Sequence, residues 1–144
     1  NVAAGVAAAL ETAGRASEPL LMREEFDTRC QGRGFVYAMS HANGIVSKAI
    51  AIVSATGADP GPGIVTAVNF GRDADCPAAV TRGIAGAVSG DSGLAQARVG
   101  ELDEATAANP HTCLELSIRG MAGMVLDGLR NEMARARRRT DLLG

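Results

Sequence analysis

The sequence predicts an all-α protein, and three observations on its composition and patterning support that fold class. Ala and Gly dominate the chain, and aromatic residues make up only 3% of it, with no Trp. A core of small side chains suits helices whose backbones pack closely, whereas β-strands favour aromatic and β-branched residues. Several stretches place apolar residues at helical spacing and are bounded by glycine or proline. At 144 residues the chain has the size of one domain.

The expected helices follow one another without an internal repeat or a clear linker. An Ala-rich helix over residues 2–12 ends near Gly14, a second begins after Pro19, and a third covers residues 43–55. Residues 57–63 hold three glycines and two prolines, which predicts a break. Pro77 is expected at the first position of a helix over residues 77–89, where its missing N–H costs nothing. A long final helix is expected over residues 112–139. We expect loops over residues 27–34 and 71–76 and a loosely structured segment over residues 94–110. Residues 64–70 form an apolar run whose secondary structure the pattern does not decide.

Charge and cysteine content limit the classes of partner. The formal net charge is −2, so no strong field attracts nucleic acid or an acidic membrane surface. No run of about 18 apolar residues is present, so no membrane span is expected. Cys30, Cys76 and Cys113 are widely spaced and form no CxxC pair. Neither a zinc site nor a disulfide framework is indicated, which favours a reducing, cytoplasmic location.

The residues that carry chemistry are two carboxylates two positions apart, Asp73 and Asp75, ahead of a helix. If this loop is extended, alternate side chains point the same way and both carboxylates face one point. Converging carboxylate oxygens suit a hard cation such as Mg²⁺ or Mn²⁺ better than zinc, and a helix N-terminus favours a phosphate nearby. The alternative is that the aspartates are ordinary N-caps of the following helix.

A longer string around the two aspartates resembles a known family. Asn-Phe-Gly-Arg-Asp-Ala-Asp at residues 69–75 is followed by Gly-Ile-Ala-Gly-Ala-Val-Ser-Gly at residues 83–90. This pattern resembles the C-terminal motif of the ADP-ribosylglycohydrolase family, which includes dinitrogenase reductase-activating glycohydrolases, animal ADP-ribosylhydrolases and a lens crystallin. The resemblance implies the all-α fold of that family, with residues 1–144 as the C-terminal half of a single domain.

The resemblance also implies site residues. Asp73 and Asp75 match the two aspartates that bind the family's binuclear Mg²⁺ (or Mn²⁺) centre. Cys76 stands where most members have a Thr or Ser that is also a ligand, and a soft thiol is a poor donor for a hard ion. Gly71 and Arg72 are candidate substrate-binding residues, although for Arg72 we favour the role of screening the aspartates.

The glycines after the motif have a packing role of their own. Gly83, Gly86 and Gly90 are three and four residues apart, so they form a bare stripe on one face of a helix. Such a stripe lets another helix approach closely, and we expect packing rather than ligand binding there.

The resemblance implies an incomplete enzyme. The family has two further metal-binding loops, of Gly-Asp-Ala and Thr/Ser-Asp-Asp-Thr type, and its general acid/base carboxylate precedes the present motif. None of these is found here, so catalytic residues are expected outside this chain. We therefore expect an ADP-ribosylglycohydrolase-type hydrolase that acts on an ADP-ribosylated substrate only when joined by the N-terminal half, as a separate chain or a cleaved segment. The start at Asn1, without an initiator Met, fits such an origin.

Two alternatives stay open at this point. One is a related N-glycosidase or nucleoside-processing hydrolase that acts on a small molecule. The other is a non-catalytic, crystallin-like member in which Cys76 marks a lost metal site.

Overall fold

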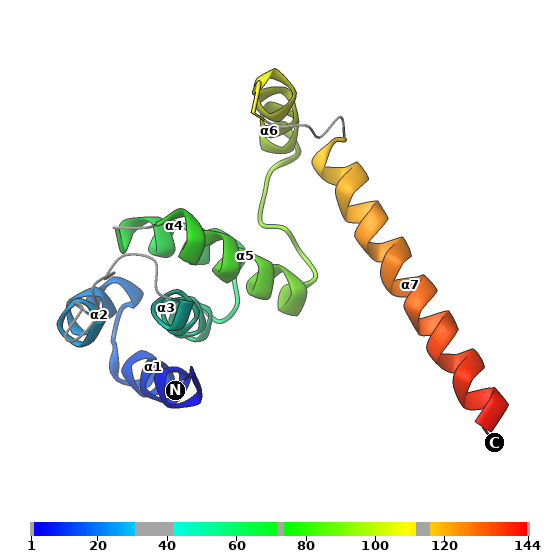
Figure 1. Ribbon diagram of the computed structural model, residues 1–144. Helices are drawn as coiled ribbons and strands as arrows, with labels where there is room; N and C mark the ends of the chain where they lie inside the picture. The colour runs from blue at the N-terminus through cyan, green and yellow to red at the C-terminus, as the bar shows by residue number, and fades with distance from the viewer. Residues whose placement is uncertain (1, 31–41, 72–73, 112–115, 144) are drawn as a thin grey trace. The chain divides into compact units, whose positions relative to one another are not determined.

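A computed structural model describes residues 2–30, 42–71, 74–111 and 116–143, and within these ranges every regular element is a helix (Figure 1). The all-α prediction is confirmed. The helices in chain order are α1 (Val2–Arg15), the short 3₁₀ helix η1 (Pro19–Leu21), α2 (Met22–Cys30), α3 (Ala42–Ala55), α4 (Pro60–Asn69), α5 (Asp75–Ser89), α6 (Gln96–Ala108) and α7 (Ile118–Leu143).

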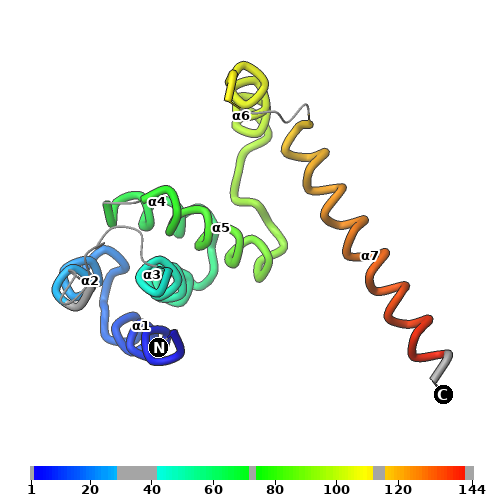
Figure 2. Tube along the Cα trace, in the orientation of Figure 1, coloured from blue at the N-terminus to red at the C-terminus, as the bar shows by residue number. Residues whose placement is uncertain are grey.

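The chain divides into two compact units, which are described separately. The first, Asn1–Gly93, contains the helices up to α5, and the second, Leu94–Gly144, contains α6 and α7. In the first unit, α1 packs against α3, α3 packs against α5, and α4 lies alongside α5 (Figure 2). Its core is assembled from the buried side chains of Ala9, Ala13, Met22, Phe26, Ala51, Ile52, Ala67 and Phe70. Half of these are alanines, as the composition predicted.

Close helix packing in this unit depends on a glycine. A Cβ atom added at Gly5 of α1 would lie 2.5 Å from Asn43 Oδ1 and 2.8 Å from Ser47 Oγ, both on α3. These distances are shorter than any van der Waals contact, so a larger residue fits at this crossing only if the Asn43 and Ser47 side chains or α1 itself move. The pairing of α1 with α3 therefore follows from the small residue at its point of closest approach.

The second unit is held together by polar contacts. Asp103 Oδ1 on α6 accepts a hydrogen bond of 2.7 Å from the backbone N–H of Ile118, the first residue of α7. Arg119 donates to Gln96 Oε1 at 2.6 Å. A carboxylate at the start of a helix accepts a hydrogen bond from an N–H group that has no acceptor inside the helix. The positive end of the helix dipole also favours the negative charge of the carboxylate. No helix in the described ranges is long and apolar enough to span a bilayer.

Several predicted boundaries were wrong. The break expected over residues 57–63 is limited to Gly57, Ala58 and Asp59, because α4 already begins at Pro60 and includes the apolar run. Helix α2 continues through residues 27–30, which were expected to be a loop, and residues 31–34 lie outside the described ranges. Helix α1 passes through Gly14 and ends at Arg15. Helix α6 occupies a segment expected to be loose, and α7 extends to Leu143 rather than ending at Arg139.

Candidate functional site

The candidate site lies where α4 gives way to α5. Helix α4 ends at Asn69, and the N–H groups of Phe70 and Gly71 donate hydrogen bonds of 3.0 Å back to Thr66 and Val68. Gly71 then adopts φ +72°, a left-handed conformation that glycine accepts without steric cost. The positive φ angle therefore explains why a glycine occupies position 71. The predicted contact of Gly71 with the substrate stays a prediction.

Helix α5 begins two residues earlier than predicted. Asp75 is its first residue, so Pro77 is the third and not the first. Proline is accepted there because the N–H groups of the whole first turn have no acceptor within the helix. The expectation of a loop over residues 71–76 was therefore wrong for Asp75 and Cys76.

The N-cap interpretation also fails for Asp75. The N-cap residue is Ala74, whose backbone is right-handed helical (φ −77°, ψ −26°) and whose own side chain makes no cap hydrogen bond. The backbone of Ala74 is therefore not extended, which was the condition under which alternate side chains were expected to face one point. Asp73 and Arg72 lie outside the described residues. A joint metal site of Asp73 and Asp75 stays a prediction.

Asp75 and Cys76 differ in exposure. The Asp75 side chain is exposed at the N-terminal end of a 15-residue helix, Cys76 is half-buried and Pro77 is buried. The positive end of the helix dipole favours a negatively charged side chain at this position. An exposed, ionised carboxylate is the ligand type that Mg²⁺ and Mn²⁺ prefer, whereas the neighbouring Cys76 is a thiol rather than half of a disulfide and suits softer ions.

A complete metal centre is not assembled by the described part of the chain. No group of three or more His, Cys, Asp or Glu side chains lies close enough there to hold an ion. The carboxylate of Asp75 is of the ligand type that the family's metal prefers; a metal centre here would need further ligands, from Asp73 as predicted or from residues beyond those described.

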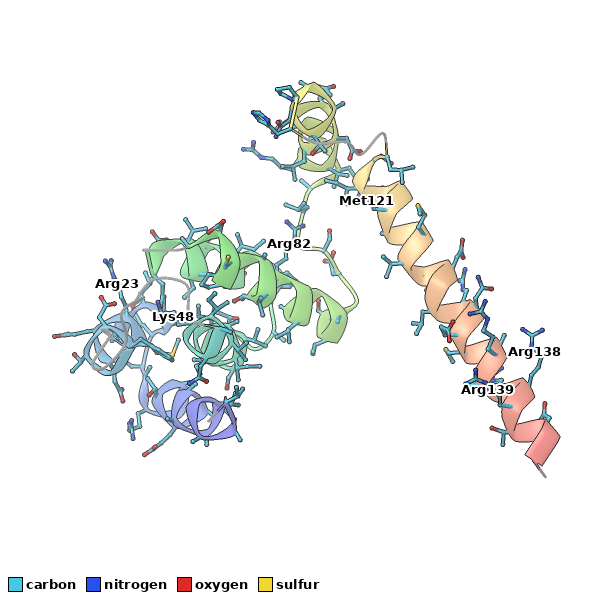
Figure 3. The ribbon with its side chains drawn as sticks, in the orientation of Figure 1. Arg23, Lys48, Arg82, Met121, Arg138 and Arg139 are labelled. Carbon is cyan, nitrogen blue, oxygen red and sulfur yellow. The ribbon has the colours of Figure 1, made fainter. Side chains whose placement is uncertain are left out.

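The structure adds a residue that the sequence patterns missed. Arg23 of α2 extends toward the end of α4, where its Nη1 donates to the carbonyl oxygen of Asn69 at 3.4 Å (Figure 3). Three residues later on α2, Phe26 contacts Phe70 edge-to-face, with ring centroids 5.9 Å apart. In the sequence, Arg23 is one charge among several in a short polar helix, and nothing local marks it as a neighbour of the motif.

The glycine stripe of α5 is not covered by another helix in the described ranges. A Cβ at Gly83 or Gly90 would have no neighbour within 4 Å, and at Gly86 it would lie 3.2 Å from the carbonyl oxygen of Asp91. Gly90 has φ +71° and ends the helix as its C-cap, which is its structural role here. Packing of a helix against Gly83 and Gly86 stays a prediction about a second polypeptide.

Comparison with known proteins gives one match. The profile of the ADP-ribosylglycohydrolase family matches residues 1–136, which is most of the chain and includes the whole site. No curated protein matches the sequence, and no solved structure does. The profile match, the all-helical fold and the motif between α4 and α5 agree with one another. This chain belongs to the ADP-ribosylglycohydrolase family.

Proposed function

We propose that this chain supplies one side of a Mg²⁺- or Mn²⁺-dependent centre that hydrolyses the glycosidic bond between ADP-ribose and its acceptor. The observation that supports this most directly is the position of Asp75. It is an exposed carboxylate on the first turn of α5, within a segment that the family profile matches. Hydrolysis adds the hydroxyl of water to ribose C1″ and returns the acceptor with a proton, so no other reactant is needed.

In this proposal Asp75 and Asp73 hold the metal from the side of α5. A bound ion of this kind orients ribose hydroxyls and lowers the pKa of a coordinated water. The chain itself would contribute the carboxylate of Asp75 on the first turn of α5, an anionic group near which positive charge can develop at C1″. Arg72 screens the two aspartates, or contacts a phosphate of the substrate together with Gly71.

We further propose that a second polypeptide segment completes the centre. In the family, the other two metal-binding loops and the general acid/base carboxylate precede this motif, and the sequence of this chain contains neither loop. We call this chain together with that segment the assembled protein. Because the cysteines form no recognisable disulfide framework, we place it in the cytoplasm.

Cys76 favours a second candidate function. A half-buried thiol next to Asp75 replaces a hydroxyl that in most relatives is a ligand. If this exchange abolishes metal binding, the chain belongs to a non-catalytic protein of the crystallin type. Metal content separates the two functions, because the hydrolase needs the ion and the structural protein does not.

The test is release of ADP-ribose by the assembled protein from arginine-linked, serine-linked and small-molecule acceptors. Removal of metal with EDTA should abolish release, and added Mg²⁺ or Mn²⁺ should restore it. We expect the double variant Asp73→Asn, Asp75→Asn to lose more than about 100-fold in turnover, since even outer-shell changes at metal sites cost about 10- to 100-fold. The control is Asp127→Asn, an exposed aspartate of α7 that pairs with Arg130 at 3.3 Å. Release that survives EDTA and the double substitution would contradict the proposal.

A further inference from the structure

One face of α2 contacts Asn69 and Phe70 and lies near Gly71, at the start of the motif string of residues 69–75. Arg23 reaches Asn69 through its Nη1, and its Nη2 lies 3.7 Å from the position that a Cβ of Gly71 would take. Phe26 packs on Phe70, which lies between them. Residues three apart on a helix share a face, so Arg23 and Phe26 act on the same short segment.

The two contacts have different physical consequences. Phe26 and Phe70 are 5% and 2% exposed, so their pair anchors the end of α4 in the core. An aromatic contact of this kind holds a ring in place but does not orient a backbone carbonyl. The N–H group of Arg23 orients the carbonyl of Asn69, because hydrogen bonds to carbonyl oxygens are directional. The carbonyl of Asn69 is among the last four of α4, which have no donor inside the helix, and a cation there is also favoured by the dipole.

Arg23 contributes little to the stability of the fold by these contacts. Its side chain is 55% exposed, its bond to Asn69 is long, and its ion pair with Asp27 has an Nε–Oδ2 distance of 3.9 Å. Exposed pairs of this type contribute roughly 0–1 kcal/mol. A large effect of Arg23 on metal binding would therefore not come from loss of the fold.

We propose that Arg23 is a positioning residue for the metal site, which fixes the connection from α4 to α5 so that Asp75 presents its carboxylate to the ion. This inference rests on the proposed function. Gly71, four residues before Asp75, has the least restricted backbone of any residue, so a contact from α2 restricts the conformations open to this connection. Ligating groups have to stay within about 0.5 Å of their productive positions, and residues around them provide that restraint.

The experiment measures Mn²⁺ affinity by electron paramagnetic resonance on the assembled protein and hydrogen exchange in residues 69–76. Arg23→Met keeps much of the side-chain length and removes the donors, and Arg23→Lys keeps a donor and the charge. We expect Arg23→Met to weaken Mn²⁺ binding about tenfold and to speed exchange in this segment, with an unchanged melting temperature. Arg23→Lys should recover most of the affinity. Arg98→Met is the control, because Arg98 is an exposed residue of α6 that pairs with Glu101 at 2.6 Å.

The outcomes separate the two proposals. If Asp75→Asn abolishes Mn²⁺ binding and Arg23→Met changes neither affinity nor exchange, the inference about Arg23 is overturned and the metal site stands. A raised KM with unchanged Mn²⁺ affinity would mean direct contact with the substrate and would also overturn it. If the wild type binds no Mn²⁺, both proposals fall. Should Arg23→Met fail to fold, Arg23→Ala, which also removes the donors, is measured instead, and unchanged affinity and exchange in that variant would count against positioning.

Discussion

Cys76 is the residue at which the chemistry of the family and the sequence of this chain diverge. It directly follows Asp75 on the first turn of α5 and is half-buried. Thiols bind soft ions and are poor donors for Mg²⁺, which prefers oxygen at about 2.1 Å. We therefore interpret Cys76 as a replaced ligand that leaves the site looser and more tolerant of Mn²⁺ than in relatives with a hydroxyl.

Restoring the hydroxyl tests this interpretation. Cys76→Thr should tighten Mg²⁺ binding by the assembled protein severalfold, on the order of 1 kcal/mol for one added oxygen ligand, and leave turnover equal or higher. Cys76→Val has the same shape as threonine without the oxygen, so it should not tighten binding. Calorimetric titration with Mg²⁺ and Mn²⁺ gives the affinities. Loss of turnover in Cys76→Thr with unchanged metal affinity would mean that the thiol has a role of its own.

At the scale of elements, helix α4 shows why prolines and glycines misled the sequence analysis. Asp59 is the N-cap and its Oδ1 accepts a hydrogen bond of 3.0 Å from the N–H of Gly61. Pro60 and Pro62 occupy the first and third positions of the helix, where a missing N–H breaks no bond within it. The prolines therefore start a helix, and a pattern rule that counts them as breakers excludes it.

Helix α6 was missed for a different reason. Its apolar residues form no stripe of helical period from which a helix could be recognised. Helices α3, α5 and α7 were predicted because their apolar residues recur with that period. Periodicity thus predicts helices with an apolar face, whether or not that face is buried, and misses helices without one.

A comparison of two glycines tests the packing of α4 on α5. In Gly63→Ala, the new Cβ would lie 3.1 Å from Thr81 Cγ2, and Thr81 is fully buried, so it has little room to move. In Gly83→Ala the new methyl has no neighbour within 4 Å, so the variant should gain roughly 0.5–1 kcal/mol of stability from reduced backbone freedom in the unfolded chain. We expect Gly63→Ala to be less stable than Gly83→Ala by about 1–2 kcal/mol in urea unfolding. Equal stabilities would show that α4 and α5 do not approach as closely as described.

At the scale of the whole molecule, large apolar side chains are exposed in both units. Examples are Val65 of α4 at 60%, Val88 of α5 at 68%, and Met124 and Val125 of α7 at 63% and 75%. Extensive exposed apolar surface marks an interaction site. We propose that the segment carrying the family's other metal loops covers such surface, including the glycine stripe of α5.

Gly83→Ala tests this proposal because we expect it to raise the stability of this chain alone but to weaken its association with the complementing segment. Gly83→Ala should stabilise this chain alone, as argued above, but a methyl group on the stripe would hold an approaching helix away. We expect it to weaken association with the complementing segment about tenfold, measured by analytical ultracentrifugation, whereas Gly100→Ala on α6, also without a neighbour within 4 Å, should leave association unchanged. Unchanged association of Gly83→Ala would remove the stripe from the interface.

The family, the all-helical fold and the motif residues were all predictable from the sequence, because a short contiguous string carries them. Three features were not. Arg23 reaches Asn69 from 46 positions earlier in the chain, and no local pattern reports such a contact. The start of α5 at Asp75 depends on the backbone geometry of the preceding residues, whereas the sequence pattern places the first helical residue at Pro77. The division into two compact units follows from contacts between helices, which composition does not reveal.

The most direct measurement is the metal content of the assembled protein, with and without the two aspartates. Mn²⁺ titration followed by electron paramagnetic resonance should give one or two bound ions per molecule for the wild type. The double variant Asp73→Asn, Asp75→Asn, which keeps side-chain size and removes charge, should bind none while its melting curve stays the same. Equal Mn²⁺ stoichiometry in the two proteins would contradict the assignment of this site.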